Sequence, residues 1–336
     1  LWAKALTQGL CPDPIRSQIY RVLFKPDKNS PEYKAVAQAA RDAQLPPLVL
    51  LQRAQAIGSA YQFHWQRFLF EHFPKGTDFP RLDAPAIGAD LPLSEAQAYS
   101  IDDSETTEID DALSVQGLGS GTVTLGIHIA APGLALSPGD PVDQLGRARL
   151  STVYMPGHKI TMLPDAVVQR YTLAEGQDCP AVSLYVRFNE ADLSLIDHQT
   201  RLERIRIAAN MRHDQLDGGV TPDWLLEPGT PWMGTTPEPA MPRASLAWLY
   251  RLALHLKQGR EQVRGKPETF NRPDYTFRLT EKTGDGPSGH ERVEISERRR
   301  GAPLDLMVAE AMILANSTWG GWMASLGVPA DRKSVV

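Results

Sequence analysis

The spacing of apolar positions divides the chain into a helical part and a mixed part. Over residues 48–70 apolar side chains recur at the three- and four-residue spacing of a helix. Ser30 followed by Pro31 marks a helix start, because serine caps the first turn and proline is preset for its first position. These features predict a small, mostly helical domain over residues 1–85, of winged-helix type. A helical packing module without a ligand of its own is the alternative.

From about residue 86 the pattern changes to an alternation with a period of two. A linker-like stretch with Pro85 and Pro92 comes first, and residues 122–129 then alternate as a strand does. Strand pairs are predicted for residues 112–116 with 122–129, 181–188 with 193–206, and 275–279 with 293–296. Helices are predicted over residues 243–260 and 303–326. This part is therefore expected to be α+β, with antiparallel strands and long helices.

Composition excludes several classes of protein. The chain has 336 residues, of which 42% are hydrophobic and 22% charged, as in a folded chain of about two domains. Its net charge of −5 gives no overall basic signature for a polyanion partner. Cys11 and Cys179 are too few for a disulfide framework or a cysteine-built zinc site. The sequence has no membrane-spanning apolar run and no signal peptide at its start, so no membrane partner and a cytoplasmic location are expected.

A dense acidic segment contains the candidate chemistry. Six carboxylates fall between positions 102 and 111, namely Asp102, Asp103, Glu105, Glu108, Asp110 and Asp111. Like charges this close repel one another by a few kcal/mol at an effective dielectric constant of about 20. A folded chain avoids such an arrangement away from bulk water unless cations offset it. Apolar residues at positions 101, 109, 112 and 113 flank the acids, which predicts that the segment is held against a core.

Hard divalent cations fit these side chains, because Mg²⁺ takes oxygen ligands and keeps waters and substrate phosphates in its shell. Two ions held by shared carboxylates can activate water and stabilise the leaving oxygen of a phosphodiester. In an extended chain Glu108 and Asp110 point to one side, and a turn through residues 104–107 would return Asp102 to them. The calcium EF-hand pattern does not fit. A solvated acidic loop without a ligand is the alternative.

The spacing of Asp102, Glu108 and the run 110–113 resembles the acidic signature of the RNB family, the catalytic domain of ribonuclease II and ribonuclease R. Further segments resemble that family in the same order, namely residues 126–130, 151–156 with 162–164, 180–184, and 300–304 with 308–316. Each segment is short, but their order across residues 98–330 is specific. The resemblance implies an RNB catalytic domain over residues 86–330.

The resemblance also implies an activity and a cofactor. The family consists of processive 3′→5′ exoribonucleases that hydrolyse single-stranded RNA to nucleoside 5′-monophosphates with two Mg²⁺ ions, and Mn²⁺ is an alternative ion. Asp102, Asp110 and Asp111 match its metal-site acids, so they and Glu108 are the expected catalytic and metal-binding residues. At position 108 the family more often has Asp. The Glu108 carboxylate sits one methylene further out, and a positioning error of that size can reduce the rate.

Contacts with single-stranded RNA are expected from Tyr154 and from a run of three arginines. Tyr154 matches the family's aromatic residue that stacks on the terminal base. Arg298, Arg299 and Arg300 are candidates for binding phosphates, with a solvated run as the alternative. His128 is predicted to pack within its strand and not to bind metal, and Glu310 and Asn316 to orient or pack within their helix.

The ends of the chain carry two further expectations. The first residue is not Met, and the resemblance stops after residues 326–330, before the segment in which the family has an arginine near the scissile phosphate. Residues 331–336 match one reading frame of a common sequencing adapter, so they are expected to be a non-native tail on a truncated RNB domain. Such a fragment is expected to be weakly active or inactive. A non-catalytic RNA-binding or regulatory relative, with Glu108 marking a drifted site, is the alternative function.

Overall fold

The computed structural model describes residues 1–82, 90–268, 274–281, 288–298 and 301–329. The chain folds into two compact units. The first, here the helical unit, comprises residues 1–81 with the short segments 152–160 and 277–296. The second, here the barrel unit, comprises residues 82–151, 161–276 and 297–336. The predicted tail, residues 331–336, lies outside the described residues, as do Arg299 and Arg300.

Residues 1–82 form helices, as predicted, around a small apolar core that includes Leu6, Ile15, Val36 and Leu51. The Ser30 hydroxyl accepts a hydrogen bond from the Tyr33 N–H, which is the predicted cap. The helices are α1 (Trp2–Thr7), α2 (Asp13–Arg16), α3 (Ile19–Phe24), α4 (Pro31–Asp42), α5 (Pro47–Arg53) and α6 (Ala60–His72).

The helical pattern over residues 48–70 belongs to two helices and not to one. After α5 the backbone of Gln55 turns to a φ of +52°, and Ser59 then starts α6 by accepting from the Gln62 N–H. Residues 1–82 contain no strand, so the hairpin of a winged helix does not lie in the predicted range. The hairpins of the helical unit come from distant segments, β4 (Val153–Met155) with β5 (His158–Ile160) and β8 (Asp274–Thr280) with β9 (Arg292–Arg298).

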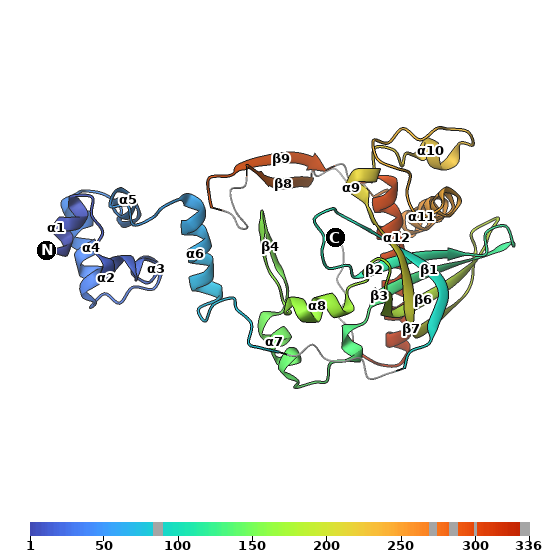
Figure 1. The fold of residues 1–336 in the computed structure, drawn as a ribbon, viewed down its shortest axis with the longest axis horizontal. Helices are drawn as coiled ribbons and strands as arrows, with labels where there is room; N and C mark the ends of the chain where they lie inside the picture. The colour runs from blue at the N-terminus through green and yellow to red at the C-terminus, as the bar shows by residue number, and fades with distance from the viewer. Residues whose placement is uncertain (83–89, 269–273, 282–287, 299–300, 330–336) are drawn as a thin grey trace. The chain divides into compact units, whose positions relative to one another are not determined.

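The barrel unit is built on a closed barrel with the strand order β1-β2-β3-β6-β7 (Figure 1). Its strands are β1 (Leu93–Asp102), β2 (Asp111–Gln116), β3 (Thr122–Ala130), β6 (Asp178–Asn189) and β7 (Leu195–Arg212). The predicted hairpins β2–β3 and β6–β7 are confirmed, and both are antiparallel. β1, which follows Pro92 of the linker-like stretch, was not predicted, and it closes the barrel by pairing in parallel with β7. The closing strand was missed because its small and polar residues give no clear alternation.

Helices cover the outer face of the barrel (Figure 1). Leu125, Ile127 and Leu184 share one apolar cluster with Trp248 of α11 and Leu304 of α12. Both predicted helices are confirmed, as α11 (Arg243–Arg264) and α12 (Pro303–Ser325). The remaining helical elements of this unit are the 3₁₀ turn η1 (Pro132–Leu134), α7 (Pro141–Arg149), α8 (Asp165–Tyr171), α9 (His213–Leu216) and α10 (Pro222–Leu226). No helix in the described ranges is long and apolar enough to cross a membrane.

The two long helices are joined by a buried charge. Glu310 of α12 is only 2% exposed and forms an ion pair with Arg260 of α11. The same guanidinium donates a hydrogen bond of 3.0 Å to Glu268. Glu310 therefore orients its helix, as predicted, but it does so against the neighbouring helix. Removing one partner would leave a buried charge without compensation, which is strongly destabilising.

Small and polar side chains fill the inside of the barrel. The His128 ring lies between two hydroxyls, with Nε2 at 2.9 Å from Ser114 Oγ and Nδ1 at 2.8 Å from Ser183 Oγ. Each hydroxyl can donate or accept, so the neutral imidazole is satisfied in either tautomer. A Cβ at Gly126 would lie 2.7 Å from His128 Nε2, so this network requires glycine there. The prediction that His128 packs within its strand is confirmed.

His128 makes the stability of the fold depend on pH. Burial lowers its pKa to about 3, so the folded state keeps the ring neutral while the unfolded state gains a proton below pH about 6.5. Stability is therefore complete above pH about 6.5 and decreases as the pH falls from there toward about 3. Between pH 6.5 and 5.0 the free energy of unfolding should fall by about 1.5 kcal/mol more in the native chain than in His128→Gln. Urea unfolding at both pH values measures this, and equal losses in the two proteins would contradict it.

Candidate active site

The acidic segment lies at one end of the barrel. Asp102 is the last residue of β1 and Asp111 the first of β2, and these strands are antiparallel neighbours with Tyr99 opposite Leu113. β7 runs parallel to β1 and ends beside it, with Arg212 opposite Asp102. Three strand ends therefore meet at the acidic segment.

A turn returns the chain from β1 to β2, as the spacing predicted. The Thr106 N–H donates to the Asp103 carbonyl at 3.0 Å, and the Glu105 N–H donates to the Asp103 side chain. Beyond the turn the Ile109 N–H donates to the Thr172 hydroxyl at 2.7 Å. Ile109 itself is 3% exposed. The prediction that the segment is held against a core is confirmed, which argues against a loosely solvated loop.

Asp110 lies within electrostatic reach of the other three expected site acids. Burial raises the pKa of Asp110, and the charges of Glu108 and Asp102 raise it further. Burial also raises the pKa of Asp111 to about 6, with the charges of Asp102 and Asp110 adding to the effect. These shifts mean that the ionised carboxylates destabilise one another in the folded chain.

Asp102 gives the sharpest test of whether a cation fits. Burial raises the pKa of Asp102, while a hydrogen bond from Ser100 and the charges of Arg212 and His213 act in the opposite direction. Its Oδ2 atom is buried and has no hydrogen-bond partner in the described part of the chain. A buried oxygen without a partner is costly, and a bound cation would satisfy it.

The donor chemistry therefore fits a hard divalent cation, although the side chains do not form a ready ligand set. Within the described residues, no three His, Cys, Asp or Glu side chains are already arranged to hold an ion. Carboxylate oxygens are the ligands that Mg²⁺ and Mn²⁺ prefer. Asp102, Glu108, Asp110 and Asp111 are the residues that would hold such an ion.

Residues from the end of β7 and from α9 hold the turn, and the sequence analysis missed them. Arg212 Nη1 donates to the carbonyl oxygens of Asp103 at 2.8 Å and Thr106 at 3.1 Å. The Asp214 carboxylate accepts from the N–H of Ser104 at 3.0 Å and from its hydroxyl at 2.7 Å. The polar residues at positions 210 and 212–214 are a weak local signal for them, and the predicted strand ended before these positions, at residue 206.

The expected RNA contacts are Tyr154 and three consecutive arginines, none of which belongs to the acidic segment. Tyr154 belongs to the helical unit, on β4, where its side chain is 71% exposed. Arg298 ends β9, and its side chain lies outside the described part of the chain together with Arg299 and Arg300. The roles of these four residues stay predictions.

A barrel with carboxylates gathered where three strands end defines a candidate metal-dependent hydrolase. The chain belongs to the RNB domain family, whose model matches residues 91–330. It is 30% identical over 246 residues to Exoribonuclease 2 of Vibrio vulnificus, across 72% of this chain and 34% of that protein. The chain thus spans about one third of the length of this relative.

Solved structures share the fold. The Dss1 exoribonuclease active-site mutant D477N from Candida glabrata matches 95% of this chain and 44% of its own, with a TM-score of 0.71 and 18% identity. RNase R of Mycoplasma genitalium in complex with ribose-methylated single-stranded RNA matches 74% of this chain and 36% of its own, with a TM-score of 0.57 and 16% identity. Yeast Ssd1, a pseudonuclease, matches 81% and 32%, with a TM-score of 0.55 and 18% identity. Because nucleases and a pseudonuclease share this fold, the fold alone does not decide whether a member is catalytic.

The raised pKa of Asp111 predicts opposite effects of one substitution with and without metal. The ionised Asp111 destabilises the folded chain above pH about 6, and this cost is relieved as the pH falls toward the unfolded pKa of about 4. At pH 8 in EDTA, Asp111→Asn should therefore raise the free energy of unfolding by about 1–2 kcal/mol. Millimolar Mg²⁺ should stabilise the native chain and not the variant, so that the difference shrinks or reverses.

Thermal unfolding with and without Mg²⁺ measures both effects. Glu105→Gln is the matched control, because Glu105 is an exposed acid of the same segment whose charge does not contribute to the raised pKa of Asp111. A chain whose stability does not respond to Mg²⁺ would favour the solvated acidic loop.

The tether from Arg212 predicts a second effect on metal binding. Arg212→Ala removes both hydrogen bonds to the turn and should weaken Mn²⁺ binding by roughly 10- to 100-fold, as is typical of residues that position metal ligands. Arg206→Ala on the same strand removes only the contact with Asp178 and should leave Mn²⁺ affinity unchanged. Isothermal titration calorimetry with Mn²⁺ compares the two, and equal affinities would show that the turn holds its shape without Arg212.

Proposed function

We propose that this chain is the catalytic RNB part of a 3′→5′ exoribonuclease that hydrolyses single-stranded RNA processively to nucleoside 5′-monophosphates. The observation that carries the proposal is the position of the acidic segment at the end of the barrel, where burial and neighbouring carboxylates, Glu108 among them, raise the pKa values of Asp110 and Asp111. The relationship to Exoribonuclease 2 supports the same reaction class.

The four carboxylates would hold two Mg²⁺ ions, or Mn²⁺ in their place. When bound, such ions stabilise the charge that develops on the attacked phosphate and activate water as the nucleophile. The chain's own contribution is to tie down the turn between these residues through Arg212 and Asp214. Without metal Asp111 is ionised at pH 8 and gains a proton below pH about 6, so the site loses one negative charge and binds a cation more weakly in acid.

RNA contacts complete the proposal. An exposed tyrosine ring stacks on any base, so Tyr154 suits a terminal nucleotide of arbitrary sequence. Arg298, Arg299 and Arg300 would bind phosphates of the same strand. The partner is single-stranded RNA, in keeping with the RNA complex of the Mycoplasma genitalium relative.

A single-turnover assay tests the reaction, because excess protein makes even slow hydrolysis visible. With 5′-labelled single-stranded RNA and Mg²⁺, we expect products shortened stepwise from the 3′ end, and nucleoside 5′-monophosphates by chromatography. Asp110→Asn should reduce the hydrolysis rate by at least about 100-fold, since it removes a ligand oxygen charge, while RNA affinity is retained. Glu105→Gln, in the same segment, should hydrolyse as the native chain does.

Glu108 is the observation that favours the alternative, a non-catalytic RNA-binding relative. RNA binding without release of monophosphates, and without dependence on Mg²⁺, would support that alternative and contradict the proposal. Glu108→Asp introduces the residue more usual in the family. A gain of hydrolysis in this variant would identify the longer side chain as the cause of a low rate.

A further inference from the structure

Charge is unevenly divided along the chain. Residues 1–81 contain 11 Lys and Arg against 6 Asp and Glu, a net charge of +5 in a chain whose total is −5. The remaining residues therefore carry a net charge of −10. A positive helical segment attached to a negative catalytic part has the electrostatic character of a polyanion-binding module.

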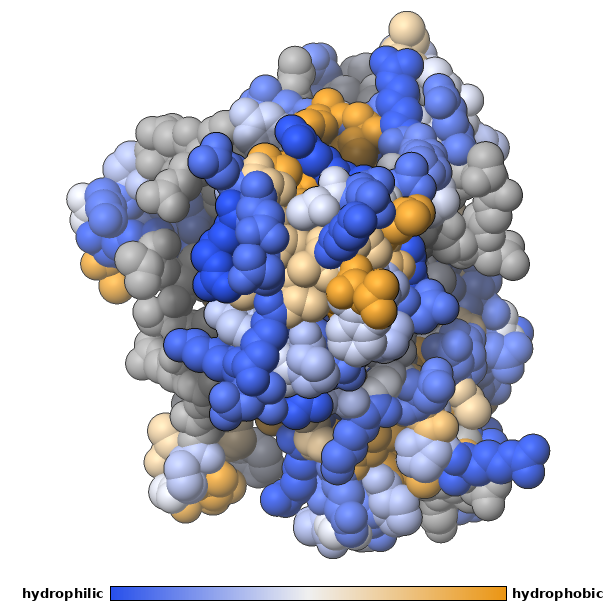
Figure 2. Space-filling view, turned by 90° about the vertical axis from the view of Figure 1, so that its left-hand side faces the viewer, coloured by the Kyte–Doolittle hydropathy of each residue, from blue (hydrophilic) through white to orange (hydrophobic). Residues whose placement is uncertain are grey.

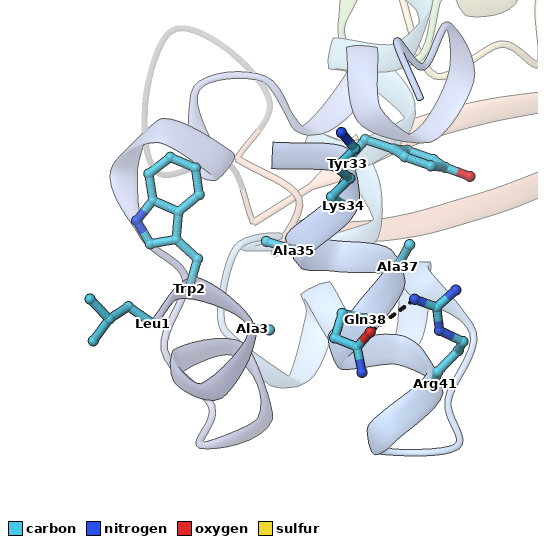
Figure 3. A pocket seen from close by; sticks show the side chains of 9 residues that line it. All are labelled: Leu1, Trp2, Ala3, Tyr33, Lys34, Ala35, Ala37, Gln38 and Arg41. Atoms are coloured by element: carbon cyan, nitrogen blue, oxygen red, sulfur yellow. Dashed lines mark hydrogen bonds between the residues drawn. The ribbon is translucent and has the colours of Figure 1, made fainter. Parts of the chain in front are cut away.

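A groove between α1 and α4 lies in this positive segment (Figure 3). It is an open depression of about 740 Å³, lined on one side by Trp2 of α1 and on the other by Lys34, Gln38 and Arg41 of α4. The size is that of a ligand site and exceeds what a single nucleobase requires. Figure 2 is viewed from the side on which Figure 1 draws α1–α5, and this face is largely hydrophilic with smaller apolar patches.

The polar side chains of the groove form one stripe on α4. Lys34, Gln38 and Arg41 are exposed and spaced four and three residues apart, so they lie on one face of the helix. The buried residues Val36, Ala39 and Ala40 occupy the opposite face, against the core of the helical unit. Arg41 donates a 2.9 Å hydrogen bond to the Gln38 side chain, whose amide in turn donates to the Asp42 carboxylate at 2.7 Å, so the guanidinium is held in place through a neutral partner.

Trp2 gives the groove an aromatic wall. Its indole is only partly buried, packing against the apolar core with one part and lining the groove with the rest. An indole face beside an ammonium and a guanidinium is the combination that binds single-stranded nucleic acid, because the ring stacks on bases while the cations meet phosphates. A protein ligand would instead call for a broader apolar surface than this groove offers.

We propose that the α1–α4 groove is a second RNA-binding site, which holds single-stranded RNA with a base stacked on Trp2 and phosphates at Lys34 and Arg41. The groove shares its ligand with the proposed exoribonuclease function but not its residues, its metal or its chemistry. It needs no divalent ion, because its charges are positive.

Fluorescence anisotropy of a labelled 12-nucleotide oligouridine, bound to the whole chain in EDTA, tests this site. Without metal the acidic segment repels phosphate, so binding by the groove dominates. At 50 mM salt, the double variant Lys34→Ala/Arg41→Ala should bind roughly tenfold more weakly. Its slope of log affinity against log salt should become shallower by about 1.4, since each lost phosphate contact accounts for about 0.7. Trp2→Ala should weaken binding about tenfold with an unchanged slope, and Trp2→Phe should retain most of the affinity.

The matched control removes the same charge elsewhere. Lys28 and Lys75 are exposed residues of the same segment that do not line the groove, so Lys28→Ala/Lys75→Ala should change affinity by less than about threefold. Circular dichroism confirms that each variant is folded. Equal losses in the two double variants, unchanged binding in the groove variant, or no RNA affinity of the native chain would each overturn the proposal.

These outcomes are independent of the proposed exoribonuclease activity. That activity fails if Mg²⁺ produces no monophosphates, whatever the oligouridine affinity in EDTA. A groove variant that loses RNA affinity in a chain that never hydrolyses RNA would still establish the groove as an RNA site.

Discussion

The mutual repulsion of the carboxylates at the end of the barrel is the constraint on which the functional part of this protein depends. Asp102, Asp110 and Asp111 all have raised pKa values, with burial as the largest cause. A flexible segment would relieve the repulsion by moving the acids apart. The chain instead ties the segment down from β7, α9 and Thr172, so the repulsion remains and favours a cation at that place.

The barrel supplies the rigidity that this arrangement needs. Its strands turn apolar side chains outward onto α11 and α12, while hydroxyls and a neutral imidazole pair with one another inside. β1 and β7 end at the acidic segment, and β2 begins there. Packing along the whole barrel therefore determines the positions of the carboxylates. The Arg260–Glu310 ion pair in turn ties together the two helices that cover the barrel.

The net charge of −5 is the sum of a positive helical segment and a negative remainder, so it does not describe either part of the chain. A negative site attracts RNA only through metal ions, whereas a positive helical segment attracts it directly. The two properties cancel in the sum and complement each other in function. A chain with this division could hold a strand at one place and cut it at another.

The sequence alone was sufficient for much of the fold, and it supplied the candidate site acids. The β2–β3 and β6–β7 hairpins and the two long helices were predicted because alternation and helical spacing are local properties of the chain. The acidic spacing pointed to the RNB family because the ligands come from one short segment. The turn that returns Asp102 toward Asp110 also followed from spacing alone.

The parallel pairing of β1 with β7 and the contacts of Arg212 and Asp214 with the turn emerged from the tertiary structure. Both join residues about 110 positions apart, and no local pattern records such a partnership. The burial of the site acids was likewise decided by the tertiary structure. The unpaired oxygen of Asp102 and the raised pKa of Asp111 depend on what the folded chain places around them, because desolvation is a property of surroundings and not of a residue type.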